Sequence, residues 1–524
     1  MKISYKKLRL LAVIYAILPI IIFYIGWFNP VSALIFSAAA AAGFFFFTRN
    51  PDEGEYSFVY ISGKKIIAVA IIALLWCFIG GQGGFVYQSS DHIIRNAILQ
   101  DMIKYPWPVI YDGDQLLSYY IAQWMVPACF GKAVLALTGS ISAAFMTGRI
   151  ALLIWSSTGI FIALLLVSVI TSSNEKANIF LSSVMFILFS GLDIVGMIIF
   201  NGTGSSLHLE WWAGDNFAQF SSFTTCLFWV YNQFIVSLLI TLCIINEKRP
   251  SNFAFLGILT LPYGPFPFIG IVMICIIKAV VFLTGQYREN TLFGGIKAVF
   301  SLQNIISLFA VGLPFGLYYM SNSIISNDVN RNGENINTGL RLHDGLSEYI
   351  SQGKFADAFL FGGKYLLFLL LEAGIFFIII MLYHKKNHRR DITFILSSAT
   401  LIFIPLFQIG TAFDFGMRVS IPAIIYIGIE FIRFADAELP KKGFFKDFRK
   451  IMNTDPMLIL AMLAFCIGAF TSLNEFGRIF MGTIYYGTGG EYEQIDSLND
   501  QEKVENFLSP GYKESLFYEF LLKK

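Results

Sequence analysis

The sequence predicts an all-α polytopic membrane protein with about 13 transmembrane helices and further helices on one membrane surface. Three observations predict this class. Of the 524 residues, 56% are hydrophobic and only 14% are charged, whereas soluble proteins carry about 25% charged residues. Apolar runs of about 20 residues, the length that crosses a bilayer, recur throughout the chain. Lys and Arg gather in alternate connecting segments. A net charge of +2 gives no indication of a nucleic-acid partner.

Hydropathy sets the predicted spans. Basic residues, including Lys7 and Arg9, precede the first run. That run is long and lacks a small-residue cleavage site, so it is predicted to be a retained helix rather than a signal peptide. The pair around "LPYGPFPFIG" is short and broken by proline, and one kinked hairpin is the alternative there. The thirteen predicted spans are 8–28, 31–48, 66–84, 150–171, 177–200, 223–245, 253–264, 266–283, 302–320, 359–383, 392–410, 419–434 and 457–473.

The basic residues predict the orientation. If the N-terminus lies on the inner side of the cytoplasmic membrane, every inner connecting segment is basic, including "NEKRPSN" and "HKKNHRR". The segment 116–137 is apolar, but Gln123, Pro127 and Lys132 interrupt it, and we predict amphipathic helices on the outer surface. The expected divisions are an N-terminal two-helix hairpin with its inner loop (1–64), a transmembrane core (65–473) with a large outer loop (85–148), and a short outer C-terminal tail (474–524).

The stretch "YQSSDHIIRNAILQDMIKYPWPVIYDG" is unusually polar for this chain. It predicts a helix from Asp91 to Lys104, because Ser89 and Ser90 are good N-caps and the "PWP" run beyond it favours an extended turn. The helix dipole favours a carboxylate at Asp91, and Arg95, four residues on, would share its face. An apolar stripe would rest on the membrane surface. The alternative is an interfacial helix whose acid is only a cap.

Three other outer segments also combine charged or histidine side chains with aromatic ones. They are "GTGSSLHLEWWAGDNFAQFSS", "GLRLHDGLSEY" and "FDFGMRVSIP". Aromatic faces suit sugar rings, although tryptophan is also a common membrane anchor. An acid and an arginine four residues apart, as in "FDFGMR", have the alternative of simply pairing with each other. No P-loop, GxSxG, HExxH or CxxC motif is present. The candidate site residues are Asp91, His92, Arg95, His208, Glu210, Trp211, Arg341, His343 and Arg418, with Asp112, Asp114 and Asp414 as possible second acids.

The order of parts between Gly80 and Ser168 is distinctive. A membrane helix ends in "GGQGG", an acid opens the large outer loop, "LLSYYIAQW" and "FGK" follow, and Arg149 opens the next helix. This order resembles that of the GT-C glycosyltransferases, most closely the branch of lipid A aminoarabinose transferases and protein O-mannosyltransferases. In that branch the surface segment reads "PPLYYWL…LFG". Here "LL" replaces the leading "PP", and two additional helices precede the matching one.

The resemblance implies a transferase that moves a sugar from a polyprenyl-phosphate donor to a hydroxyl of a glycan, lipid or protein acceptor. The reaction would take place on the outer face of the cytoplasmic membrane, in the assembly of a cell-envelope glycan. Asp91 would be the general base, and nearby basic residues would hold the leaving phosphate. Glu210 or Asp112 would be a second acid or a ligand of a divalent metal ion. The alternative is a transporter or flippase of a lipid-linked glycan, favoured by the intramembrane acids Asp193 and Glu372.

Overall fold

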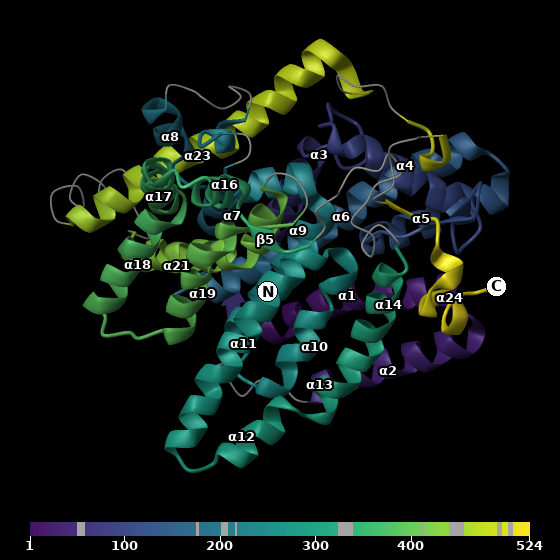
Figure 1. Cartoon of the computed structure of the whole chain (residues 1–524), viewed down its shortest axis with the longest axis horizontal. Coiled ribbons are helices and arrows are strands. Elements are labelled where there is room, and N and C mark those ends of the chain that lie inside the picture. The colour runs from purple at the N-terminus through teal and green to yellow at the C-terminus, as the bar shows by residue number, and fades with distance from the viewer. Residues whose placement is uncertain are drawn as a thin grey trace.

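The computed structural model describes residues 1–49, 58–173, 178–200, 208–214, 217–322, 339–409, 413–439, 455–489, 495–500 and 507–524. Over these residues the fold is helical apart from short strands in small sheets of two or three strands (Figure 1). Nine described segments are long and apolar enough to cross a membrane, so the chain is an integral membrane protein with multiple candidate spans. They are α1 (Tyr5–Trp27), α2 (Pro30–Arg49), α6 (Ile141–Thr171), α7 with α8 (Ile179–Ile199), α9 (Phe223–Asn246), α11 (Pro265–Arg288), α12 to α14 (Leu292–Met320), α17 with α18 (Phe355–Lys386) and α23 (Pro456–Tyr486).

The described residues confirm part of the expectation of about 13 spans. Nine of the thirteen expected spans coincide with these segments, and the other four are shorter or more polar. Pro262 and Pro405 interrupt two of the four, because proline removes a backbone hydrogen-bond donor. Another carries Glu430 and Arg433 near its end. The four correspond to α3 (Gly63–Ile79), α10 (Phe253–Ile258), α19 (Ile392–Phe403) and α21 (Ile421–Glu438).

The two ends of α1 have different neighbours. Before α1, β1 (Lys2–Ser4) pairs antiparallel with β2 (Phe58–Tyr60), which returns the segment after α2 to the start of the chain. At the other end, the Trp27 ring lies 5.3 Å from that of Trp107, in the loop after α4. Between Arg9 and Trp27 the helix rises about 27 Å. We call the first side the Arg9 end and the opposite side the Asp91 end.

The helix α6 connects the same two ends. Near its beginning, Arg149 donates hydrogen bonds to the carbonyls of Gly83, over 2.6 Å, and of Gly84. These glycines belong to the turn that precedes Asp91. From Arg149 to Thr171, where α6 ends, the helix rises about 33 Å. The guanidinium therefore fixes the turn from which Asp91 emerges.

The predicted surface helix within the large outer loop is partly buried in the protein. It forms α5 (Ala122–Thr138), which is 17 residues long and is not among the nine candidate spans. Its first half packs against α1 and α6, and Gln123 and Trp124 are fully buried. The polar Gln123 side chain donates to the hydroxyl groups of Tyr15 and Ser156, both over 3.3 Å. Gln123 and Pro127 are thus inside the protein, whereas Lys132 is half-buried and donates to the carbonyls of Ile103 and Tyr105.

The helix α4 (Asp91–Lys104) has the predicted bounds but not the predicted surroundings. Its apolar stripe does not rest on the membrane surface, because residues such as Ile98 are fully buried. Ile103 fits between Gly131 of α5 and Gly148 of α6, where an added Cβ on either glycine would meet its Cδ1 at 2.5 Å. Clamped in this way, α4 holds Asp91 in a fixed position.

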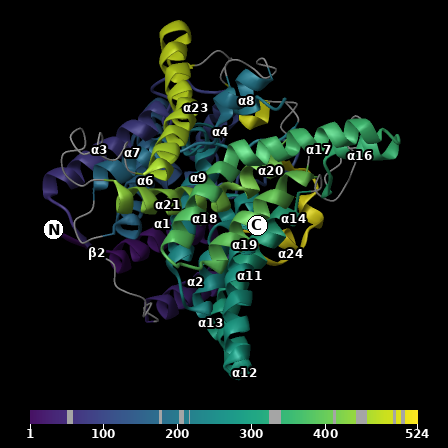
Figure 2. The ribbon, with the colours of Figure 1, turned by 90° about the vertical axis from the view of Figure 1, so that its left-hand side faces the viewer.

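The last long helix continues beyond its predicted end at residue 473. α23 runs on to Tyr486, so residues 474–486 of the expected tail are helical. Figure 2 shows this helix at the edge of the molecule, with one end extending past its neighbours. The extension reaches the segment before α4, where the Tyr87 N–H donates to the Thr483 hydroxyl over 3.0 Å. It also carries Glu475 and Arg478 to the Asp91 end.

Candidate functional site

A break in α9 supplies the backbone of the site. Val230 has non-helical dihedral angles, φ −134° and ψ 38°. A break of this kind leaves carbonyls without their usual i+4 amide partners, and buried carbonyls require other donors. Here three side chains from the segment between α3 and the first turns of α4 supply them. Gln82 donates to the carbonyl of Leu227 over 2.8 Å, His92 to that of Phe228 over 2.8 Å, and Arg95 to that of Trp229.

His92 is a buried, neutral member of this set. Its Nε2 faces a carbonyl and must carry the proton, while its Nδ1 accepts from the Gln88 amide over 3.2 Å. Its ring stacks on Tyr231, with ring centroids 5.4 Å apart. Burial, aided by the charge of Arg95, lowers the pKa of His92 to about 4. At neutral pH His92 therefore holds α4 against α9 and carries no charge for a phosphate.

Asp91 and Arg95 form the predicted pair. The Arg95 guanidinium lies 2.9 Å from the Asp91 carboxylate, and the two side chains are 5% and 37% exposed respectively. The predicted side-chain cap of the helix is wrong, because the Ser90 side chain makes no capping hydrogen bond. The arginine is thus the inner member, anchored to α9, and it presents the acid to the outside of the protein.

A second pair of the same design lies close by. In α20 (Asp414–Val419), Arg418 lies 3.1 Å from Asp414, and again the acid is the more exposed partner. Burial acts to lower the pKa of Arg418, but the negative charge of Asp414, with Tyr120, Tyr119 and Asp91, outweighs it and raises that pKa. The buried Nε of Arg418 makes no hydrogen bond to any described residue. The charge of Asp91 therefore reaches Arg418, and the two arginines, Arg95 and Arg418, both act on the Tyr119 and Tyr120 hydroxyls between the pairs.

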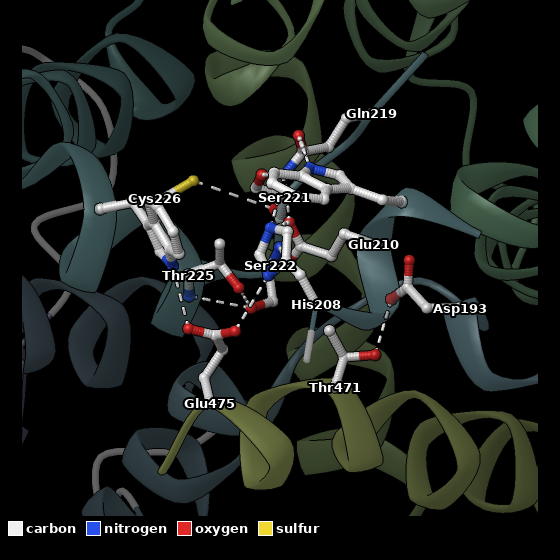
Figure 3. Close-up of polar contacts among 12 residues, drawn as sticks. Asp193, His208, Glu210, Gln219, Ser221, Ser222, Thr225, Cys226, Thr471 and Glu475 are labelled. Atoms are coloured by element: carbon white, nitrogen blue, oxygen red, sulfur yellow. Dashed lines mark hydrogen bonds and ion pairs between the residues drawn. The ribbon is translucent and has the colours of Figure 1, made fainter. Parts of the chain in front are cut away.

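The second predicted cluster adjoins the first through Trp229. Figure 3 shows His208 and Glu475 facing each other, with His208 Nδ1 3.0 Å from the Glu475 carboxylate. Glu475 also accepts hydrogen bonds from the Trp229 indole, over 3.0 Å, and from Arg478, over 2.8 Å. Since the carbonyl of Trp229 binds Arg95, this one residue connects the two clusters.

Glu210 lies on the other side of His208, with 3.8 Å between the ring and the carboxylate. It accepts hydrogen bonds from the Ser222 N–H, over 2.9 Å, and from Gln219. Burial raises the pKa of Glu210 to about 7, although the charge of His208 opposes the shift. For His208, burial acts to lower the pKa, but the hydrogen bond to Glu475 and the charge of Glu210 raise it overall. Trp211 closes this cluster, edge-on to His208.

The remaining candidate residues have partners of their own. Asp112 accepts from the Asn499 amide over 2.8 Å, and Asp114 lies 2.7 Å from Lys513. Both acids flank the turn between β3 (Ile110–Tyr111) and β4 (Gln115–Leu117), and β4 pairs with β7 (Leu508–Ser509) near the C-terminus. These contacts assign Asp112 and Asp114 to the attachment of the C-terminal segment.

Arg341 and His343 belong to a separate strand pair. β5 (Arg341–Leu342) pairs with β6 (Phe407–Gln408), a few residues before α20. Arg341 lies 2.8 Å from Asp344, and His343 donates to the carbonyl of Phe217 over 2.6 Å. His343 thus ties the segment between the second cluster and α9 to this strand pair.

Sequence reasoning missed the most connected acid of the site. Glu475 falls in the predicted C-terminal tail, because the last predicted span ends at residue 473. The helical spacing of Phe476, Ile479 and Phe480 around Glu475 and Arg478 is the signal that predicts a continuing helix. Gln82 and Trp229, which bind across the α9 break, carry no comparable signal.

No group of three or more His, Cys, Asp or Glu side chains suited to holding a metal ion occurs among the described residues. Comparison of the chain with protein-family models, with curated proteins and with solved structures finds no match.

Proposed function

We propose that the protein is a membrane glycosyltransferase with a GT-C-like arrangement, acting on a polyprenyl-phosphate sugar. The observation that carries the proposal is the placement of Asp91, a partly exposed carboxylate, 2.9 Å from the Arg95 guanidinium, with its charge also acting on Arg418. A transferase of this kind needs a base for the acceptor and positive charge for the leaving phosphate, and both are present within one cluster. The resemblance of the segment 80–168 to GT-C enzymes supports the same reaction.

In the proposed reaction, Asp91 accepts the proton of the acceptor hydroxyl as its oxygen attacks the anomeric carbon of the donor sugar. The bond from that carbon to the phosphate oxygen breaks, and the electron pair leaves with the polyprenyl phosphate. Charge-assisted hydrogen bonds from arginine to phosphate are strong and directional, so Arg418, with an uncommitted Nε, is the residue best suited to hold the leaving group. No step is routed through a metal ion.

The orientation is part of the proposal. Basic connecting segments typically remain on the cytoplasmic side. Residues from five of the predicted inner segments, including the N-terminal one, meet around one cavity at the Arg9 end. We therefore propose that the Arg9 end lies at the inner face of the cytoplasmic membrane and the Asp91 end at its outer face. A lipid-linked donor at the outer face would present its headgroup to Asp91.

The test is sugar transfer by purified protein from a polyprenyl-phosphate sugar to an acceptor extract of the source membranes. We expect Asp91→Asn to lower the rate by about 10²- to 10⁴-fold, the usual loss when a general base is removed. The matched control is Asp357→Asn, an exposed acid on α17, which leaves the rate unchanged. Normal transfer by well-folded Asp91→Asn protein would falsify the assignment.

A transporter of a lipid-linked glycan is the second candidate. It is favoured by two buried acids within candidate spans. Asp193 accepts from the hydroxyl groups of Ser190 and Thr471, over 3.0 and 2.7 Å. Glu372 accepts from the Trp212 indole over 2.7 Å, and it lies in a π-helical turn between α17 and α18, a distortion frequent at functional sites. Loss of glycan translocation into vesicles by Glu372→Gln, with Asp91→Asn active, would select this function.

A further inference from the structure

A basic cavity lies at the Arg9 end, away from the site proposed for sugar transfer. Its volume is about 560 Å³, and it is bounded by the beginning of α1, the ends of α6 and α9, the middle of α11, and α21. Three of these helices, α1, α6 and α9, also reach the Asp91 end. The charged side chains of the lining are Lys6, Arg9, Lys248, Lys278, Arg389 and Arg433, with Glu247 and Asp391 as the acids.

The acids of the cavity do not neutralise its bases. Six basic side chains face two acidic ones in the lining. Glu430 adds a third acid from behind, where it binds Arg389 over 3.0 Å and also Arg433. Counting all three acids still leaves a surplus of three positive charges among the described residues.

The acids are committed to orienting the bases. Glu247 is fully buried and binds Arg9 while accepting from the Asn252 amide over 3.0 Å. Asp391 accepts from the Phe394 N–H at the start of α19, over 2.9 Å, and lies 3.1 Å from Arg389. Such arrangements fix the arginines in place and leave the surplus of positive charge, rather than free arginine donors, to attract a ligand.

One of these arginines is buried. Arg9 is 4% exposed and lines the cavity. Its Nε makes no hydrogen bond to any described residue, and an unsatisfied buried donor costs about 1–3 kcal/mol. The charge of Arg9 thus lies at the wall of the cavity, where it favours an anion inside. Lys6 and Lys248, at the rim, are exposed and have no ion-pair partner among the described residues.

The neighbouring surface is apolar. Lys278 lies on α11 between Ile276 and Val280, which are 57% and 53% exposed. On a candidate membrane span, such exposed apolar residues face lipid. A lipid with its anionic group in the cavity could therefore pack its acyl chain along the exposed apolar side chains of α11.

We infer that this cavity binds a phosphate group, and that its position beside the apolar face of α11 suits the phosphate of an anionic phospholipid. Basic pockets between transmembrane helices are known to receive such headgroups. The inference does not depend on the proposed transferase, because the cavity lies at the opposite end of α1 from the proposed catalytic residues.

The experiment measures thermal unfolding of the full chain in detergent, titrated separately with phosphatidylglycerol, phosphatidylcholine, inorganic phosphate and glycerol 3-phosphate. We expect phosphatidylglycerol to raise the unfolding midpoint and phosphatidylcholine to have no effect. The double variant Lys6→Gln/Lys248→Gln, which spares every buried contact, should raise the phosphatidylglycerol concentration needed for half of the shift about thirtyfold, the loss expected from two charges near a headgroup.

The control is Lys297→Gln/Lys354→Gln, two exposed lysines outside the cavity, which should respond like the wild type. Stabilisation by inorganic phosphate or glycerol 3-phosphate that the Lys6/Lys248 double variant loses would support the phosphate site and identify its ligand as soluble. Equal responses of the wild type and that double variant to every ligand, or equal effects of the two phospholipids, would overturn the inference.

Discussion

The two ends of the helix bundle present opposite charges from the same kind of ion pair. At the Asp91 end the arginine is inside and the acid outside: Arg95 is 5% exposed against 37% for Asp91. At the Arg9 end the order is reversed, since Glu430 is 1% exposed and its partner Arg389 is 39% exposed. The inner member orients the outer one, so one end offers carboxylates and the other offers cations. The exposed carboxylate suits a base for a hydroxyl group, whereas the exposed arginine at the other end suits an anion from outside; at the Asp91 end, the proposed phosphate contact falls to an inner arginine, Arg418.

The largest effect that sharpens the comparison is expected at Arg418. Replacing it by glutamine removes the charge proposed for the leaving phosphate, and the rate of sugar transfer should fall by about 10²- to 10³-fold, as when other transition-state donors are removed. Arg418→Lys should recover little, because lysine lacks the planar fork of donors. The control Arg390→Gln, on the exposed surface at the other end, should retain the wild-type rate. Comparable rates for Arg418→Gln and the control would contradict the assignment.

The next effect breaks the pair at the opposite end. Glu247→Gln leaves Arg9 buried without its carboxylate, and losing one partner of a buried pair costs about 3–5 kcal/mol of unfolding free energy. The matched exposed pair is Arg341 with Asp344, where Asp344→Asn should cost at most about 1 kcal/mol. Thermal or denaturant unfolding in detergent measures both. Similar losses for the two variants would mean that burial does not distinguish these pairs.

A smaller effect concerns pH at the Asp91 end. A histidine in the unfolded chain has its ordinary pKa of 6.5, whereas that of folded His92 is about 4. As the pH falls, the unfolded state binds the proton first. The contribution of His92 to the unfolding free energy is therefore fully present above about pH 6.5, and the protein loses at most roughly 3 kcal/mol as the pH drops to 4.

His92→Gln, which retains a donor for the Phe228 carbonyl, should remove this part of the pH dependence. Arg95, Asp91 and Arg478 also act on His92, and His208 and Glu210 titrate nearby. The useful quantity is therefore the difference between the unfolding curves of the wild type and the variant across pH 4–7. Parallel curves would show that His92 does not titrate as its surroundings indicate.

The smallest effect tests the break in α9. Gln82→Leu removes the donor to the Leu227 carbonyl and should lower the unfolding free energy by about 1–3 kcal/mol, the cost of one unsatisfied buried group. The exposed Gln352→Leu is the control and should change stability by less than about 0.5 kcal/mol. An unaltered midpoint for Gln82→Leu would indicate that water or a backbone amide replaces the side chain.

Local spacing predicted part of this site and could not predict the rest. The end of α4 and the Asp91–Arg95 pair follow from helix-ending prolines and an i,i+4 interval, both contained within a few residues. The break at Val230 has no proline or glycine beside it. The carbonyls that the break exposes accept hydrogen bonds from Gln82, His92 and Arg95, well over one hundred residues earlier in the chain. Only the tertiary structure therefore reveals the break. Likewise, the charges of the connecting segments predicted that the basic segments share one side of the membrane. They did not predict that residues from these segments line one cavity.

Trp229 makes the two clusters of the Asp91 end mechanically inseparable. Its carbonyl is bound by α4 and its indole by α23, and Arg478 lies over its ring, 4.8 Å from the ring centroid. A rotation of this one side chain would loosen Glu475, and a shift of its backbone would move Arg95 and with it Asp91. A disturbance of Glu475, or of Asp91 through Arg95, should therefore change the fluorescence of the Trp229 indole.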